Sequence, residues 1–124
     1  MSREIKFRSF VNNNKCIYFD FGNIRDLNFE EMRGYDIQEY TGLKDKNGKE
    51  IYEGDIISHN SKIFVICYSK NLGIVGIMLD KNYHTFIDTV KRNHSFVYFH
   101  YIANVSKYLE VIGNIYENPE LIKF

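Results

Sequence analysis

The amino-acid sequence predicts a mainly β protein: an N-terminal hairpin followed by a small β-barrel or sandwich, with one or two short helices. The first reason is composition. Phe and Tyr, which favour strands, make up the whole 16% aromatic content, whereas Ala, the strongest helix former, occurs once in 124 residues. The second reason is patterning, because short apolar segments alternate with clusters of Asn, Gly and Asp that favour turns.

The length fits a single domain, because 124 residues are enough for one hydrophobic core and too few for two. We expect this domain to cover residues 1–124, with the hairpin and a connecting arm in residues 1–40. The β core, a last strand and a short helix are expected in residues 41–124.

Residues 5–21 carry the predicted hairpin. Three consecutive asparagines at residues 12–14 supply a polar turn, and CIYF at residues 16–19 resumes the strand. The next segment, residues 23–34, is polar with scattered apolar residues. Both one turn of helix and a connecting loop fit that segment.

The segment TGLKDKNGKEIYEGDII, at residues 41–57, concentrates charged and turn-forming residues, which suggests a cation or phosphate site. A calcium-binding loop is excluded, because Gly48 falls at the fourth position counted from Asp45 and the twelfth position lacks a carboxylate. The GxxxxGK[ST] spacing of a phosphate-binding loop occurs nowhere in the chain. The segment therefore predicts a pair of turns.

The first of these turns centres on Asn47-Gly48, which predicts a type I′ hairpin turn with positive φ at both residues. The second centres on Gly54, and Asp55 is expected to cap its own backbone there. This second turn leads into a strand at residues 56–57.

Further apolar segments predict the strands of the core. Residues 62–68 and 73–79 are apolar on both faces and rich in β-branched residues, as in strands buried between layers. Residues 95–102 and 108–116 predict two more strands, the latter with a bulge at Gly113.

Two segments carry helix signals. In residues 80–92 apolar residues recur at helical spacing, although the threonines there suit a strand equally well. Near the C-terminus, Asn118 as a cap and Pro119 at the first helical position predict a short helix.

Charge and hydropathy give no sign of a membrane protein. Lys plus Arg and Asp plus Glu number 16 each, so no net charge draws the chain toward nucleic acid or a membrane. Apolar runs are too short for a signal peptide or a membrane span. We expect a cytoplasmic protein without a membrane partner.

The residues that commonly carry chemistry lack the necessary spacing. Cys16 and Cys67 do not form a CxxC pair and are expected to be buried reduced thiols. The four histidines lack the HxxxH and HExxH spacings, so neither a metal site nor a cofactor is predicted. No local signature of a nucleophile is present, and an enzyme is not predicted.

Residues 91–101, KRNHSFVYFHY, suggest nucleic-acid binding. Lys91 and Arg92 would contact phosphates, while Phe96 and Tyr98 would stack on unpaired bases. FVYF matches half of an RNA-binding motif whose glycines are replaced in this chain. Core packing of the same aromatic residues and a protein interface are the alternatives.

Three segments resemble the YopX family of phage and prophage proteins in sequence, order and spacing: EIKFRSF at residues 4–10, TGLKDKNGKEIYEGDII at residues 41–57 and LEVIGNIYENPELI at residues 109–122. The resemblance implies a small, mainly β protein encoded by a phage or prophage of a low-GC Gram-positive bacterium. It implies no reaction and no catalytic residue. The matching positions are rich in turn formers, which define a backbone path: Gly42, Asn47, Gly48, Gly54, Asp55, Gly113, Asn118 and Pro119.

The predicted function is binding. The chain has 10 Phe and 10 Tyr, more than one small core is expected to hide, and exposed aromatic residues favour protein interfaces. We expect a non-enzymatic accessory protein that binds another protein or itself as a homo-oligomer. A single-stranded nucleic-acid-binding module is the alternative, and an enzyme whose site is assembled in space is a third reading.

Overall fold

The computed structural model describes residues 4–12, 15–59, 61–69, 73–79, 96–98 and 106–122. Its strands form two antiparallel sheets, ordered β2-β1-β3-β4 and β8-β7-β6-β5-β9. The strands are β1 (Lys6–Val11), β2 (Lys15–Asp20), β3 (Gln38–Lys44), β4 (Glu50–Tyr52), β5 (Asp55–His59), β6 (Lys62–Ser69), β7 (Gly73–Leu79), β8 (Phe96–Tyr98) and β9 (Glu110–Asn114). The helical elements are η2 (Ile24–Asp26), α1 (Phe29–Met32), η3 (Ser106–Tyr108) and η4 (Pro119–Ile122), all 3₁₀ except α1.

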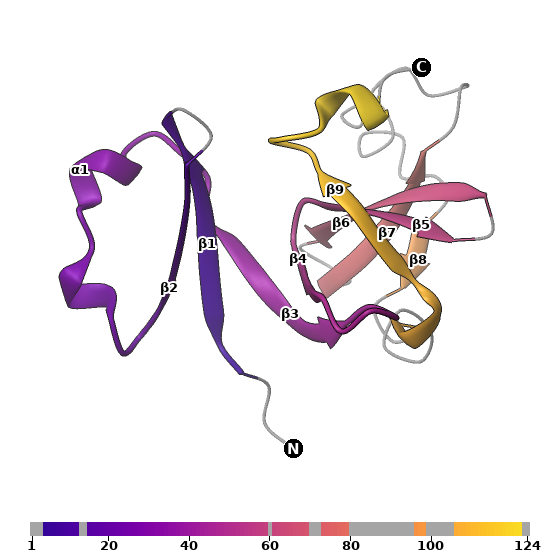
Figure 1. Ribbon diagram of the computed structural model, residues 1–124, viewed down its shortest axis with the longest axis horizontal. Helices are drawn as coiled ribbons and strands as arrows, with labels where there is room; N and C mark the ends of the chain where they lie inside the picture. The colour runs from indigo at the N-terminus through magenta and orange to yellow at the C-terminus, as the bar shows by residue number, and fades with distance from the viewer. Residues whose placement is uncertain are drawn as a thin grey trace.

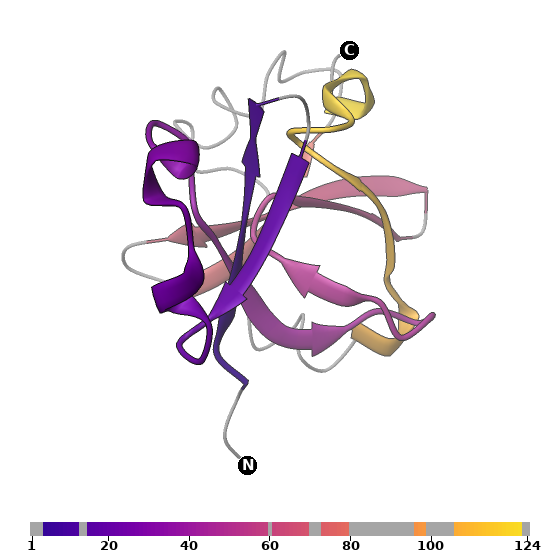
Figure 2. The ribbon, with the colours of Figure 1, turned by 60° about the vertical axis from the view of Figure 1, so that its left-hand side comes forward.

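Figure 1 shows two lobes, with β1, β2 and α1 on one side, β5 to β9 on the other, and β3 running from the first toward the second. We call the first the N-terminal lobe and the second the core lobe. In Figure 2 the strands of the hairpin run across the direction of β5 and β6. The described strands do not close into a barrel, so the sandwich is the predicted architecture that fits.

The N-terminal hairpin is confirmed, with β1 and β2 paired from Lys6 opposite Asp20 to the far end of both strands. Residues 23–34, for which helix and loop were both open, form η2 and α1. The helix begins after Asn28, whose side chain accepts from the Glu31 N–H at 3.2 Å. One buried cluster joins this helix to the hairpin: Val11, Phe19 and Met32.

Strand β3 links the lobes. Its first residues pair with β1, where Glu39 lies opposite Phe7, and its later residues pair with β4, where Tyr40 lies opposite Tyr52. The register against β4 shifts within β3, which contains Gly42 with a φ of 87°. Strand β3 spans the predicted boundary between the N-terminal arm, residues 1–40, and the β core, residues 41–124. The assignment of the whole chain to a single domain stays a prediction.

The turn at Asn47-Gly48 is not the predicted type I′ turn. Among the described residues other than glycine, only Ser61 has a positive φ, so Asn47 lacks the conformation that type I′ requires. The Gly48 N–H donates to the Asp45 carbonyl at 3.0 Å, and the Asp45 N–H donates to the Lys49 carbonyl at 2.8 Å. With a φ of 80° at Gly48, this is a three-residue loop closed by a glycine bulge.

The Asp45 carboxylate explains the difference in turn type. Its Oδ1 accepts from the backbone N–H groups of Asn47 and Lys49 at 2.8 and 2.9 Å. Its Oδ2 accepts from the Val111 N–H of β9 at 2.9 Å. Asp45 thus shapes the turn and attaches it to the core lobe.

The second predicted turn is present and carries the chain from β4 in one sheet to β5 in the other. Gly54 has a φ of 84°, as a turn glycine requires. Asp55 does not cap the backbone that follows it, so that prediction is wrong. Its Oδ2 instead accepts from the Tyr52 N–H behind it, at 2.7 Å.

Strands β5, β6 and β9 bury side chains on both faces of the sheet, as the apolar pattern of β6 predicts. The predicted strands at residues 62–68 and 73–79 are confirmed as β6 and β7, which pair antiparallel. One face packs against the β3–β4 hairpin through a buried cluster: Ile51, Ile57, Ile66, Leu109 and Val111. The other face is covered by the C-terminal residues, with Ile56 and Val65 buried and Leu121 and Ile122 packed against them.

Strand β9 carries the predicted bulge, because its register against β5 shifts at Ile112, next to Gly113. A Cβ on Gly113 would lie 2.5 Å from Asn118 Oδ1, so this glycine admits the Asn118 side chain. That side chain accepts from the Asn114 N–H at 3.2 Å, while the Asn118 carbonyl accepts from the Leu121 N–H at 3.0 Å at the start of η4. Pro119 does occupy the first position of η4.

Some predicted segments lie outside the described residues. Of the strand predicted at residues 95–102, the structure describes β8, which pairs with β7. Residues 80–92, with their helical spacing, lie outside, as do Lys91 and Arg92. No helix in the described part of the chain is long and apolar enough to cross a membrane.

Candidate functional site

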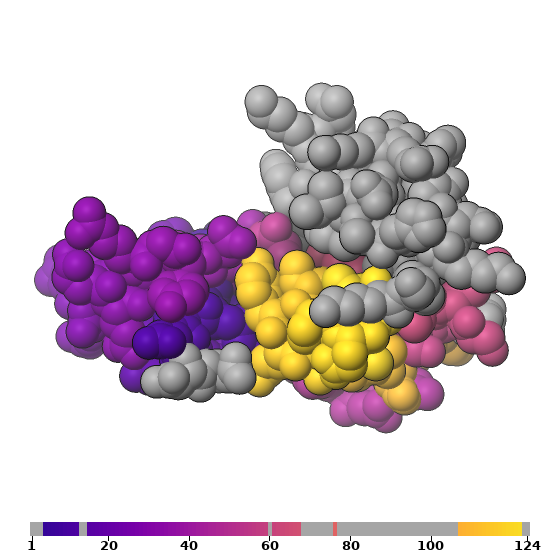
Figure 3. Space-filling view, turned by 90° about the horizontal axis from the view of Figure 1, so that it is seen from above, coloured from indigo at the N-terminus to yellow at the C-terminus, as the bar shows by residue number. Residues whose placement is uncertain are grey.

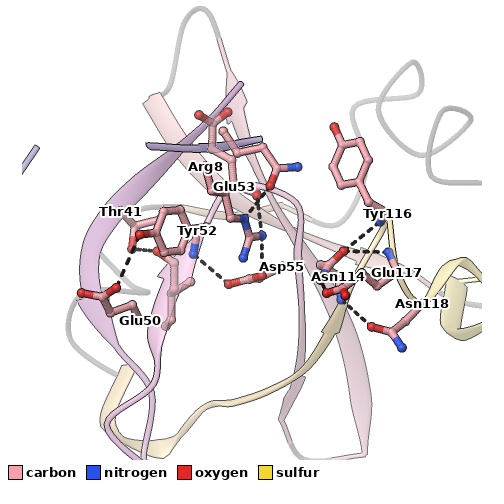
Figure 4. Close-up of polar contacts among 12 residues, drawn as sticks. Arg8, Thr41, Glu50, Tyr52, Glu53, Asp55, Asn114, Tyr116, Glu117 and Asn118 are labelled. Carbon is pink, nitrogen blue, oxygen red and sulfur yellow. Dashed lines mark hydrogen bonds and ion pairs between the residues drawn. The ribbon is translucent and has the colours of Figure 1, made fainter. Parts of the chain in front are cut away.

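The two lobes meet at Arg8 of β1 and Asp55 of β5, drawn in Figure 4. Arg8 Nη2 donates to Asp55 Oδ1 at 2.7 Å, and the two side chains are only 5% and 2% exposed. The same Nη2 reaches the Glu53 carbonyl at 3.2 Å. The guanidinium also lies over the rings of Phe10 and Tyr52, 4.9 and 4.6 Å from their centroids. The charge of Arg8 is therefore neutralised inside the protein.

Burial raises the pKa of Asp55, while the Arg8 guanidinium and the Tyr52 N–H oppose that change. Both Asp55 oxygens have a donor, one from each of these groups. Removal of either partner of such a buried ion pair strongly destabilises the fold, because the remaining charge is left uncompensated.

Further contacts hold the side chains beside this ion pair. Arg8 Nε donates to Gln38 Oε1 at 2.6 Å. The Tyr116 hydroxyl donates to Asp36 Oδ2 at 3.0 Å. The Phe10 ring stacks on the Tyr116 ring with centroids 5.4 Å apart. These contacts fix the orientation of Gln38 and Tyr116 at the junction.

The same side chains line a cavity of about 260 Å³ at the junction of the lobes. Figure 3 shows the C-terminal residues, in yellow, lying against the N-terminal lobe. The walls come from the start of β3, the β4–β5 turn, β6 and the residues after β9: Asp36, Ile37, Gln38, Glu53, Gly54, Ile66, Cys67, Ile115 and Tyr116.

Gly54, which has no side chain, lets Gln38 and Tyr116 lie close to the turn in the cavity wall. A Cβ there would lie 2.6 Å from Gln38 Nε2 and 3.3 Å from a ring carbon of Tyr116. The Gly54 N–H donates to the Ile66 carbonyl at 2.7 Å, and its carbonyl accepts from the Ile115 N–H at 2.9 Å. The turn is thus held against β6 and the residues that follow β9.

The half-buried carboxylate of Glu53 lines the cavity. Its Oε1 accepts from the Glu39 N–H at 2.9 Å. Within the described residues, no lysine, arginine or histidine forms an ion pair with it. Burial raises the pKa of Glu53, and the nearby charge of Glu39 adds to the effect.

Cys67 is the thiol of the cavity. Burial raises its pKa to about 11, with a further contribution from the charge of Glu53. The group is therefore protonated at neutral pH and a weak nucleophile. Cys67 and Cys16 are both free, as predicted, but half-buried where full burial was expected. In the part of the chain that the structure describes, no group of three His, Cys, Asp or Glu is placed to hold a metal ion.

Exposed apolar side chains gather on the N-terminal part of the chain. Of the large hydrophobic residues exposed in the described ranges, all but Tyr108 fall within residues 5–37: Ile5, Tyr18, Phe21, Phe29, Tyr35 and Ile37. Ile37 is 56% exposed and also lines the cavity, so the rim of the cavity has an apolar part beside the exposed Asp36.

The chain is similar to a known protein family and to a solved structure. The model of the YopX protein family matches residues 4–123. The chain belongs to the YopX family. A similar solved structure is the crystal structure of protein EF1440 from Enterococcus faecalis, with 25% sequence identity and a TM-score of 0.61, covering 98% of this chain and 100% of that chain. No curated protein matches the chain at a significant level. The descriptions of the family and of the solved structure name neither a reaction nor a ligand.

In this YopX-family protein, the sequence motif and the cavity overlap only in part. Gly54 lines the cavity and Asp55 lies in the ion pair beside it, whereas the other motif positions shape turns and bulges elsewhere. Phe96 and Tyr98 are in β8, at the edge of the second sheet. The proposed roles of Phe96, Tyr98, Lys91 and Arg92 in binding nucleic acid stay predictions.

Sequence reasoning missed Arg8, Gln38, Glu53 and Tyr116. A weak signal was present for the first of these, because Arg8 shares a face of its predicted strand with Phe10. Asp55, placed directly before two isoleucines, is a second charge in an apolar setting. No pattern in the sequence pairs these two residues.

Proposed function

We propose that this YopX-family protein is a non-enzymatic binding module that holds a segment of another protein at the junction of its lobes. The observation that carries the proposal is the cavity of about 260 Å³ with Ile37, 56% exposed, at its rim. Pockets for drug-sized ligands and cofactors measure roughly 300–1,000 Å³. A smaller cavity beside apolar surface suits one side chain of a protein partner.

The surrounding surface supports a protein partner. Exposed apolar side chains favour protein contacts, and six of the seven large hydrophobic residues exposed in the described ranges fall within residues 5–37. Phe29 and Phe21 are 61% and 66% exposed, which is unusual for phenylalanine in a soluble domain. A partner that enters the cavity would also cover part of this surface.

The chemistry of the lining supports binding in place of catalysis. Cys67 is protonated at neutral pH, and none of the described residues that line the cavity is a histidine that could activate it. The carboxylates, the Tyr116 hydroxyl and the apolar walls are suited to holding a group in place. Action in the bacterial cytoplasm, carriage by a phage and self-association stay predictions from the sequence.

Selection from a random peptide library on the immobilised protein tests the proposal. We expect the selected peptides to converge on a shared sequence. Their affinity should fall about tenfold in Ile37→Ser, which removes apolar surface at the rim. Ile5→Ser is the matched control, because Ile5 is 47% exposed and does not line the cavity.

Two results would overturn the proposal. One is the absence of any convergent peptide. The other is a set of peptides that bind Ile37→Ser and Ile5→Ser equally well, because binding would then lie away from the cavity. Light scattering on the free protein shows separately whether a second copy of the chain is such a partner.

A further inference from the structure

The charges around the cavity are unbalanced. Asp36 and Glu53 both line it, and among the described residues no lysine, arginine or histidine does. Arg8 is the cation next to it, but its guanidinium is taken up by Asp55, Gln38 and the Glu53 carbonyl. The cavity therefore has a negative character that the described residues do not offset.

Glu53 carries most of this imbalance. It is half-buried, so water solvates its carboxylate incompletely, and Oε1 has one backbone donor, the Glu39 N–H. A carboxylate in this setting gains more from a cation than an exposed one does, because the local dielectric is lower. Asp36, which accepts from Tyr116 and is exposed, adds a second charge near the mouth.

Three isoleucines make up the apolar part of the lining. Ile37 directly precedes β3, Ile66 lies in β6 and Ile115 follows β9, and all three line the same cavity. A long side chain with an apolar stem and a charged end matches such walls, because its methylene groups pack on isoleucine while its end reaches the carboxylate. Lysine and arginine are the side chains of this kind with a positive charge.

We infer that the cavity takes a basic side chain, the ammonium of a lysine or the guanidinium of an arginine, from the bound protein segment. The inference rests on the proposed function and specifies the chemistry of the partner. An acidic side chain would meet the two carboxylates, and a purely apolar one would bury Glu53 without a compensating charge, which is costly.

Titration of the protein with capped tripeptides, followed by amide NMR, tests the inference directly. The peptides are Ac-Gly-Lys-Gly-NH₂ and its arginine, norleucine and glutamate counterparts, with putrescine as a free amine. We expect saturable shifts at Gly54 and Cys67 with the lysine or arginine peptide. Norleucine, which keeps the stem and lacks the charge, should give none that saturate.

Glu53→Gln is the decisive variant, because the amide keeps an acceptor for the Glu39 N–H and removes the charge. We expect affinity for the basic peptide to fall about tenfold or more. Glu120→Gln is the matched control, because Glu120 is exposed in η4 and lies outside the cavity lining. A dispersed NMR spectrum shows that each variant is folded.

Three results would overturn the inference: norleucine binding as tightly as lysine, equal affinities in Glu53→Gln and Glu120→Gln, or saturation by putrescine alone. The last would assign the cavity to a free amine. Failure of the inference is distinct from failure of the proposed function. Convergent library peptides without a basic residue would leave the binding function standing, whereas the absence of convergence would remove it.

Discussion

Arg8 and Asp55 stand 47 residues apart in the sequence and form an ion pair of 2.7 Å in which neither side chain is more than 5% exposed. The pair joins β1 of the N-terminal lobe to β5 of the core lobe. Through Gln38 it also orients one wall of the cavity. The contact that holds the lobes together is thus part of the structure that shapes the candidate site.

Replacing Arg8 with methionine should lower the free energy of unfolding by about 3–5 kcal/mol, because Asp55 is left buried without its partner. Arg8→Lys should not restore the loss, since an ammonium lacks the planar fork that reaches Asp55 and Gln38 together. Urea unfolding measures the free energy of unfolding of both variants. A single domain predicts one cooperative transition for the unsubstituted protein.

Lys15→Met is the control for this experiment. Lys15 pairs with Glu31 at 2.7 Å, but its side chain is 61% exposed. Exposed pairs contribute about 0–1 kcal/mol. If Arg8→Met lowers the free energy of unfolding no more than Lys15→Met does, the buried pair does not hold the lobes together.

Gly54→Ala should be more destabilising than Gly34→Ala. Both glycines have a φ of 84°, so both substitutions carry the backbone strain of about 1–2 kcal/mol expected for a side chain in that conformation. A Cβ at position 34 meets nothing within 4 Å, whereas one at position 54 lies 2.6 Å from Gln38 Nε2. We expect the second contact to add about 1–3 kcal/mol. Equal unfolding free energies for the two variants would show that Gln38 moves aside freely.

The contribution of Asp45 to stability should depend on pH. Burial alone would raise its pKa, but the Val111, Lys49 and Asn47 N–H groups, with the Lys49 charge, hold the pKa of Asp45 below its ordinary value. A depressed folded pKa means that the ionised group stabilises the fold above the unfolded pKa of about 3.9. That stabilisation is lost as the pH falls through the folded pKa.

Asp45→Asn measures this contribution. The difference in unfolding free energy between the unsubstituted protein and the variant should be about 1–3 kcal/mol near neutral pH. It should shrink as the pH is lowered below the unfolded pKa of about 3.9. A difference that stays constant down to acid pH would contradict the role of the carboxylate in binding three backbone donors.

Local features of the structure could be predicted from the sequence, whereas contacts between distant segments could not. The hairpin of β1 and β2, the bulge beside Gly113 and the start of η4 at Pro119 each depend on residues next to one another. The type of the Asn47 turn was missed because the Asp45 side chain, outside the Asn-Gly pair, bonds the turn backbone.

The cavity could not be predicted for the same physical reason. Its lining comes from segments between Asp36 and Tyr116, and no periodicity or spacing links them. The charge on Arg8 is unremarkable in the sequence, because only the fold reveals that Asp55 is its partner. Turn residues such as Gly54 were recognised for their backbone role, and their position beside a cavity appears only in the fold.

Cys67 and Cys16 give a test of the binding site within one molecule. Cys67 lines the cavity, and Cys16 lies on β2 outside that lining. With a pKa of about 11, Cys67 should react slowly with iodoacetamide at neutral pH, and its rate should rise with pH toward that value. A rate that levels off near pH 8.5, as for a free thiol, would contradict its burial.

The most direct test of the account is the alkylation rate of Cys67 with and without the best peptide from the library, measured by mass spectrometry at each cysteine. If the peptide places a side chain in the cavity, the Cys67 rate should fall in proportion to the fraction of protein bound, while the Cys16 rate stays the same. An unchanged Cys67 rate at saturating peptide would contradict the claim that the cavity is where this protein binds its partner.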